Sequence, residues 1–147
     1  EHAANLNSGI KYLGFITNSE LKTICYKASI FVNPRPSNII GNESNFPSKL
    51  FEYFQYLKPI ISTKTPGISP EYENILVTTE NDSPKAIADK IIEVLSWDDA
   101  KTTEYAETTL KFIEQNKTWN HQADRLIGWL MTEFKLSVSN TTQHGAM

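Results

Sequence analysis

The sequence is poor in cysteine, in long apolar runs and in clustered positive charge. Its single cysteine, Cys25, lies in an apolar helical pattern and is expected to be a buried, inert thiol in a reducing cytoplasm. No apolar run approaches the roughly 18 residues of a membrane-spanning helix, and no stretch resembles a signal peptide. The net charge of -3, with Lys and Arg dispersed among carboxylates, argues against a nucleic-acid partner. We therefore expect a soluble globular protein.

What is present is a regular alternation of apolar strands and helices. A chain of 147 residues that is 39% hydrophobic can form one domain with its own core. Largely apolar segments predict strands at residues 10–14, 29–33, 59–63 and 74–79. Residues 29–33 form a short continuous apolar run of the kind that is buried in parallel sheets. This alternation predicts an α/β fold, a Rossmann-like doubly wound parallel sheet. We expect the domain to occupy residues 1–134 and the aperiodic residues 135–147 to be a tail or a remnant of expression.

Five helices are expected among these strands. The first begins at the T-x-x-E capping box of Thr17 and Glu20. The second runs from Pro47 toward Pro59, the third opens at Ser83, and two more cover about 98–115 and 119–134. Four of them are expected to bury apolar faces: Leu21, Ile24, Cys25 and Ala28; Leu50, Phe51, Phe54 and Leu57; Ile87, Ile91, Val94 and Leu95; and Ala123, Leu126, Ile127 and Leu130.

The carboxyl ends of the parallel strands are the expected binding edge, because ligands in doubly wound sheets bind there. Three connections should meet at this rim, namely residues 34–45, 64–70 and 80–83. The first is long for an α/β connection, where about two to six residues are usual, and long loops in compact domains are often functional. It is the first candidate for a site.

The helix after this loop opens with Ser48 and Lys49. A helix N-terminus presents free N–H groups and the positive end of the dipole, which attract an anion. Because a cation there opposes the dipole, Lys49 favours an anionic ligand over helix stability. Glu52 lies one turn further on the same side, where a carboxylate can accept two hydroxyl hydrogens of a ribose. One face of this helix could thus bind a phosphate and a ribose.

The same residues also allow a purely structural interpretation. Ser48 is a common type of helix cap, and Lys49 with Glu52 is a common solvated ion pair. No cluster of His, Cys, Asp or Glu has metal-ligand spacing, since Asp98 and Asp99 are better explained as a helix start. We therefore expect no metal, and the choice between a binding site and a surface helix stays open from these residues alone.

Several segments together resemble a known family. "FPSKLFEYFQYLKPIISTKTPGISPEY" is similar to the donor-binding segment of the family-4 retaining glycosyltransferases of GT-B fold, with an F-P-S-K-L-x-E-Y run, a K-P-hydrophobic strand and a T-P-G turn. The flanking segments that also resemble the family are "IKYLGFITNSELKTICYKASIFVNPRP", "NILVTTENDSPKAIADKIIEVL" and "TWNHQADRLIGWL". The resemblance covers roughly residues 9–134 and implies the C-terminal half of a GT-B glycosyltransferase.

The resemblance implies where a nucleotide-sugar donor would bind. Ser48 and the first-turn amides would face the diphosphate, and Glu52 corresponds to the second Glu of the family's E-x7-E motif, which holds the ribose hydroxyls. The first Glu of that motif would stand at Ser44, whereas Glu43 is one place off. The sugar would then be held by backbone groups of the residues that follow. The full implied set is Arg35, Asn45, Phe46, Ser48, Lys49, Leu50, Glu52 and Gly67.

The resemblance also implies the reaction. It predicts a retaining hexosyltransferase that takes a nucleotide-sugar, with a UDP-sugar expected, and that needs no cofactor or metal. The family's acceptor domain and a basic diphosphate-binding residue are expected to lie outside this chain, which would be inactive alone and would leave Trp119 or Trp129 partly exposed. The family's common setting is bacterial polysaccharide synthesis, such as lipopolysaccharide and O-antigen, on lipid-linked or glycan acceptors, in the cytoplasm or peripherally at the inner membrane.

Two other classes stay open. A GT-B nucleotide-sugar epimerase or hydrolase would share the donor cleft but needs its own acid and base, and His2, His121 and His144 lie outside the rim loops. A non-catalytic flavodoxin-like ligand-binding domain would explain the alternation of strands and helices, but it predicts a phosphate loop or an acidic cluster elsewhere. Titration with UDP, GDP and a flavin separates the three classes.

Overall fold

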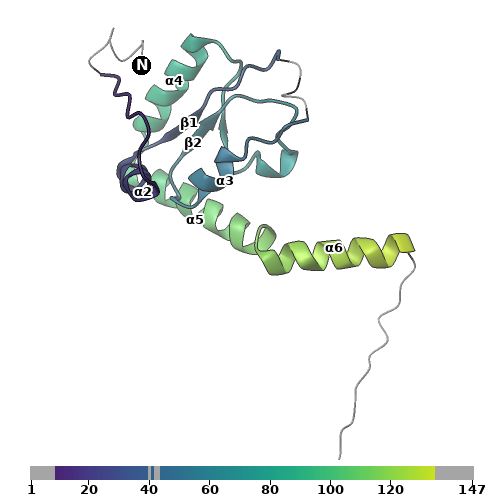
Figure 1. Cartoon of the computed structure of the whole chain (residues 1–147). Coiled ribbons are helices and arrows are strands. Elements are labelled where there is room, and N and C mark those ends of the chain that lie inside the picture. The colour runs from purple at the N-terminus through teal and green to yellow at the C-terminus, as the bar shows by residue number, and fades with distance from the viewer. Residues whose placement is uncertain (1–8, 40, 42–43, 135–147) are drawn as a thin grey trace, which may run out of the picture. The chain divides into compact units, whose positions relative to one another are not determined.

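The computed structural model describes residues 9–39, 41 and 44–134. It divides into two compact units, one ending at Thr109 and the other beginning at Leu110. The first unit contains the sheet, and the second contains the end of α5 (Asp99–Asn116) and α6 (Trp119–Phe134) (Figure 1). The tail predicted at residues 135–147 lies outside the described residues.

The sheet of the first unit consists of three parallel strands: β1 (Phe31–Asn33), β2 (Ile60–Ser62) and β3 (Val77–Thr78). Their order is β1-β2-β3, with Phe31 opposite Ile60 and Ile61 opposite Val77. All three residues of β2 are buried, as expected for a parallel strand covered on both faces. The strands predicted from three of the four apolar runs are confirmed.

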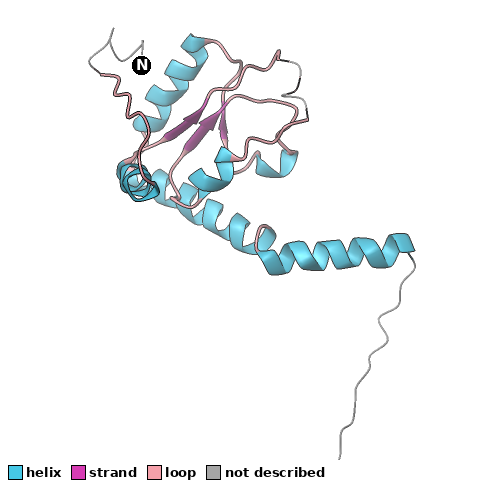
Figure 2. Ribbon diagram, in the orientation of Figure 1, coloured by secondary structure: helices cyan, strands magenta, loops and turns pink. Residues whose placement is uncertain are grey.

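Helices and a 3-10 turn surround this sheet: α2 (Asn18–Lys27), α3 (Lys49–Phe54), η1 (Pro70–Tyr72) and α4 (Pro84–Leu95) (Figure 2). Figure 1 shows β1 and β2 running between α3 and α4, and both helices contact β2. The first unit is therefore a small α/β domain with a parallel sheet, consistent with the Rossmann-like fold that the alternation predicted. None of the helices in the described part of the chain is long and apolar enough to cross a membrane.

The predicted helix starts are confirmed by their caps. Thr17 and Glu20 form the reciprocal capping box, with the Thr17 N–H donating to Glu20 Oε2 at 2.8 Å, and these hydrogen bonds lower the pKa of Glu20. The Ala86 N–H donates to Ser83 Oγ at 3.2 Å at the start of α4. At the start of α5 the Lys101 N–H donates to Asp98 Oδ1 at 2.8 Å. Each side-chain oxygen satisfies a donor that the helix itself leaves unpaired.

Tyr105 of α5 joins two parts of the sheet at the amino ends of the strands. Its hydroxyl accepts from the Ile60 N–H at 3.1 Å and donates to the Ile75 carbonyl at 2.6 Å. Both isoleucines are fully buried. Burial raises the pKa of Tyr105 to about 12. The Tyr105 hydroxyl therefore bridges the Ile60 N–H at the start of β2 and the Ile75 carbonyl just before β3, in the place of a direct hydrogen bond between these two backbone groups.

The strand predicted at residues 10–14 does not form. These residues precede α2 without regular structure, and the side chains of Ile10 and Tyr12 are 48% and 57% exposed. A β-strand exists only where a neighbouring strand supplies backbone partners, and none of the described strands pairs with this segment. The strand prediction for residues 10–14 is therefore wrong, because this segment lacks the pairing that makes a strand.

Several side chains predicted to be buried are exposed because the helices are shorter or less covered than their patterns suggest. α3 ends at Phe54 and buries only Leu50 and Phe54, whereas Phe51 is 47% exposed. Leu57, half-buried, has a φ of 53°, in the left-handed region that ends a helix. In α2 only Cys25 is buried, as predicted for this thiol. In α4 only Val94 is buried.

The apolar face predicted for α6 is not buried. Ala123, Leu126 and Ile127 are exposed, and Leu130 is partly exposed. The expected exposure of the tryptophans is confirmed, since Trp119 is 90% and Trp129 55% exposed. An amphipathic pattern indicates a face that favours burial, but it does not show what covers that face.

Candidate functional site

The loops that follow β1 and β3 meet at the carboxyl edge of the sheet, as predicted. The Ser37 N–H and hydroxyl both donate to Asp82 Oδ2, at 2.8 and 3.0 Å. These hydrogen bonds hold the pKa of Asp82 below its ordinary value. The end of β2 joins the same edge, because the Arg35 N–H donates to Thr63 Oγ1 at 2.9 Å. The rim is thus held together by residues far apart in the sequence.

A cavity of about 160 Å³ lies beside this rim, at the start of α3. It is lined by Asn33, Arg35, Asn45, Phe46, Pro47, Ser48 and Lys49. Arg35 Nη1 donates to the Asn45 carbonyl at 3.1 Å, which joins the two ends of the connection between β1 and α3. Two cationic side chains next to backbone groups suit a small anionic ligand.

The start of α3 is a weaker anion site than a long helix would provide. The helix has six residues, and the amides of Leu50 and Phe51 already donate to the carbonyls of Pro47 and Ser48 at 2.9 and 3.1 Å. Ser48 makes no side-chain capping hydrogen bond, so its interpretation as a simple cap is wrong. An anion here would interact chiefly with the side chains of Ser48 and Lys49.

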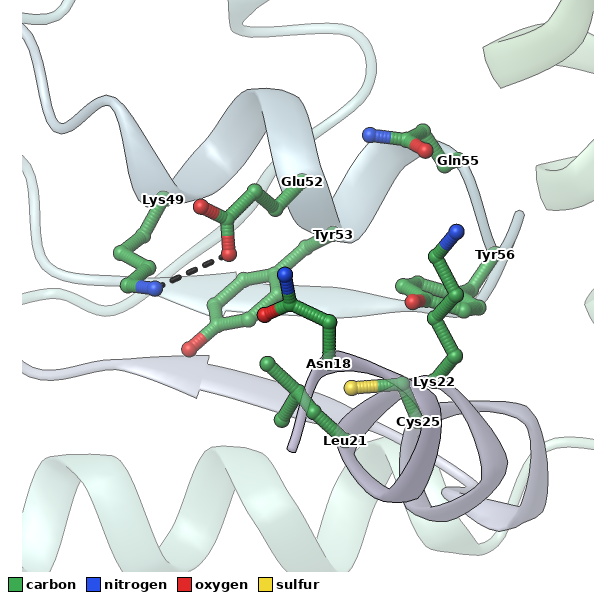
Figure 3. A pocket seen from close by; sticks show the side chains of 9 residues that line it. All are labelled: Asn18, Leu21, Lys22, Cys25, Lys49, Glu52, Tyr53, Gln55 and Tyr56. Carbon is green, nitrogen blue, oxygen red and sulfur yellow. Dashed lines mark hydrogen bonds and ion pairs between the residues drawn. The ribbon is translucent and has the colours of Figure 1, made fainter. Parts of the chain in front are cut away.

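A larger cavity of about 330 Å³ lies between α2 and α3. Figure 3 shows its lining: Asn18, Leu21, Lys22 and Cys25 from α2, and Lys49, Glu52, Tyr53, Gln55 and Tyr56 from α3 and the turn that follows. The Tyr53 ring stacks on Phe31 of β1 with ring centroids 4.5 Å apart. Burial raises the pKa of the Tyr53 hydroxyl. The cavity is thus lined by two tyrosine rings together with charged and amide side chains.

Lys49 and Glu52 lie side by side at the edge of this larger cavity (Figure 3). Lys49 Nζ is 2.9 Å from Glu52 Oε2, and the side chains are 61% and 54% exposed. The hydrogen bond to Glu52 raises the pKa of Lys49. An exposed pair of this kind contributes only about 0–1 kcal/mol to stability, so either side chain can exchange its partner for a ligand.

The comparisons with known proteins identify the family. Residues 1–96 match the family described as glycosyl transferases, group 1. The chain belongs to this family. No curated protein and no solved structure matches it. The matched residues include the sheet, the residues that line both cavities, and α4. A glycosyltransferase moves a sugar from a nucleotide-sugar donor to an acceptor.

The glycosyltransferase domain brings most of the predicted donor-binding residues together, although in two adjacent cavities. Arg35, Asn45, Phe46 and Ser48 share the smaller cavity with Lys49. Glu52 lines only the larger one, again with Lys49. Lys49 is therefore common to both.

Two predicted residues are placed differently. The Leu50 side chain is fully buried in the core, and its amide already donates to the Pro47 carbonyl. Gly67, in the loop after β2, lines neither cavity. Ser44 is exposed, and Glu43, His2 and His144 lie outside the described residues. His121 lies in α6, away from the rim loops in sequence.

Sequence reasoning missed several residues that line the larger cavity. Asn18, Lys22 and Tyr56 line the larger cavity, but nothing in their local patterns distinguishes them from ordinary helix-surface residues. Tyr53 could have been found, because it lies one turn after Lys49 and is therefore on the same side of α3. Among the described residues no group of three or more His, Cys, Asp or Glu is placed to hold a metal ion.

Proposed function

We propose that this domain binds the nucleotide-sugar donor of a retaining glycosyltransferase. The observation that carries the proposal is the position of Lys49, which borders both the small cavity with Arg35 and the larger cavity with Glu52. A nucleoside diphosphate sugar has two negatively charged phosphates between a ribose and a sugar. Lys49 lies between the two adjacent cavities, and Arg35 supplies a second cation in the smaller one. This arrangement matches the two phosphates that lie between the ribose and the sugar.

In this arrangement Glu52 binds the ribose. An ionised carboxylate accepts hydrogen bonds only, and the two ribose hydroxyls supply two donors. Glu52 has its partner Lys49 at 2.9 Å on one oxygen and remains 54% exposed, so the carboxylate can receive a ligand. Lys49 would then turn toward the diphosphate, and the Tyr53 ring would border the nucleoside. Backbone groups near Asn45 and Phe46 would hold the sugar.

The resemblance supports the finer parts of the proposal. The donor is a UDP-sugar carrying a hexose or an N-acetylhexosamine, transfer proceeds with retention, and no metal or other cofactor is required. The acceptor is a glycan or a lipid-linked sugar, as in bacterial polysaccharide, lipopolysaccharide or O-antigen assembly in the cytoplasm or at the inner membrane. The acceptor site would belong to a further domain, which this donor-binding domain serves.

The proposal is tested by nucleotide binding. Isothermal titration of the protein with UDP, GDP and a flavin, each with and without EDTA, should show UDP binding that EDTA leaves unchanged. Glu52→Gln keeps the shape of the side chain but weakens two charge-assisted hydrogen bonds, so we expect it to cost about 1–3 kcal/mol of UDP binding. The unfolding free energy should change by less than about 1 kcal/mol.

Asp89→Asn is the matched control. Asp89 forms a comparable exposed ion pair, with Lys85 Nζ 2.7 Å from Asp89 Oδ2, on α4 and outside both cavities. We expect its UDP affinity to equal that of the wild type. Failure of the wild type to bind either nucleotide would contradict donor binding. Flavin binding in their place would favour the flavodoxin-like alternative, and equal UDP affinity in Glu52→Gln would return Glu52 to the role of a surface ion pair.

A further inference from the structure

The connection between β1 and α3 is anchored where it leaves the sheet, at Arg35. This residue lies between Pro34 and Pro36, which have no N–H, so it supplies the one backbone donor of the Pro-Arg-Pro segment. The Arg35 N–H donates to the Asn33 carbonyl at 3.1 Å and to Thr63 Oγ1 at 2.9 Å. The first of these contacts is local. The second reaches across to the end of β2.

The Thr63 hydroxyl contacts Arg35 twice. Besides accepting from its N–H, the hydroxyl donates to the Arg35 carbonyl at 2.5 Å. Thr63 is 2% exposed, so water does not replace these hydrogen bonds if the hydroxyl is removed. The Thr63 N–H also donates to the Asn33 carbonyl at 3.4 Å. One side chain thus extends the β1–β2 pairing past the end of the ladder and fixes both backbone groups of Arg35.

The Arg35 side chain carries this restraint to the small cavity. Its Nη1 donates to the Asn45 carbonyl at 3.1 Å, and both residues line that cavity together with Ser48 and Lys49. The location of the guanidinium depends on the location of its own backbone. The backbone in turn has Thr63 as its one side-chain partner among the described residues.

We propose that Thr63 is a positioning residue for the donor site: its hydroxyl fixes Arg35 so that the guanidinium holds the Asn45 carbonyl and shapes the cavity that receives the diphosphate and sugar. This inference rests on the proposed donor binding. Thr63 touches no ligand itself. Its effect on nucleotide affinity therefore passes through Arg35, and that dependence can be measured.

The test compares three variants of the full chain by UDP titration. Thr63→Val keeps the shape and removes the hydroxyl, and we expect UDP affinity to fall about tenfold. Thr63→Ser keeps the hydroxyl and should bind within about twofold of the wild type. Thr65→Val is the matched control. Thr65 is also 2% exposed, but its hydroxyl has no hydrogen-bond partner among the described residues, so affinity should not change.

A double-mutant cycle separates positioning from general destabilisation. In an Arg35→Met background, adding Thr63→Val should change UDP affinity by less than about twofold. Thermal unfolding should show that the added substitution still lowers the melting temperature. If the tenfold loss persists in that background, or if Thr63→Ser loses as much affinity as Thr63→Val, the proposal is overturned. Unchanged affinity in Thr63→Val overturns it as well. A wild type that binds no nucleotide overturns the proposed function instead, and this inference with it.

Discussion

Tyr105→Phe removes the hydroxyl that joins α5 to the sheet. The substitution leaves the Ile60 N–H and the Ile75 carbonyl without the partners found at 3.1 and 2.6 Å. Both residues are fully buried, so water is not available to replace the hydroxyl. A buried polar group left unpaired costs about 1–3 kcal/mol, while the phenol no longer has to be desolvated. We expect a net loss of about 2 kcal/mol in unfolding free energy at pH 8.

The same variant should differ from the wild type in its response to alkali. Burial raises the pKa of Tyr105 from 10.0 to about 12. A raised pKa in the folded state means that the stability linked to the protonated hydroxyl is complete below pH 10 and is lost as the pH rises through 12. Each pKa unit corresponds to about 1.4 kcal/mol, so the advantage of the wild type over Tyr105→Phe should shrink by about 2 kcal/mol between pH 9 and 12.

Urea unfolding followed by circular dichroism, at intervals of half a pH unit, measures both quantities on the same samples. The two proteins differ in no other side chain, so the difference between the two curves isolates Tyr105. If the unfolding free energies of the two proteins stay parallel up to pH 12, the buried Tyr105 hydroxyl with two hydrogen bonds is refuted. A loss of unfolding free energy below about 0.5 kcal/mol at pH 8 would refute the claim that water cannot reach the Ile60 N–H and the Ile75 carbonyl.

Two further predictions concern the core and a helix start. Phe54→Ala should cost about 3–5 kcal/mol in urea unfolding, because Phe54 is 3% exposed and leaves a cavity. Phe51→Ala, at 47% exposure, should cost less than half as much, and equal losses would mean that α3 is rotated from the orientation described. Ser83→Ala should cost about 1 kcal/mol, since Ser83 Oγ caps the Ala86 N–H at 3.2 Å. An unchanged denaturation midpoint would show that solvent caps α4 equally well.

Local patterns predicted the helix starts and three of the four strands, because nearby residues determine these features. The capping box of Thr17 and Glu20 needs only four residues of sequence, and the buried strand β2 is apolar at successive positions because both faces are covered. Residues 10–14 were also predicted as a strand, but they lack a strand to pair with. Pairing and burial depend on residues distant in sequence, which a local pattern does not contain.

The candidate site was predictable to the extent that its residues are close in sequence. Ser48, Lys49 and Glu52 lie within five residues of one another, so helical geometry alone places Lys49 beside Glu52. The contact of Arg35 with Thr63 joins residues 28 apart, and that of Ser37 with Asp82 joins residues 45 apart. Those contacts follow from how the strand ends converge, and no local spacing encodes them. The division of the site into two cavities was likewise visible only in three dimensions.

The parallel register of β1 and β2 governs how quickly the chain reaches this structure. Phe31 pairs with Ile60 only after the whole connection between them, including α3, has closed into a loop. The entropy of closing that loop is lost before the first ladder bond forms, whereas α4 and α5 gain hydrogen bonds from their nearest neighbours at once. Helices form within about a microsecond. We therefore expect strand docking to be the slow step, during which the apolar residues of β2 are exposed to aggregation until β1 and β3 cover them.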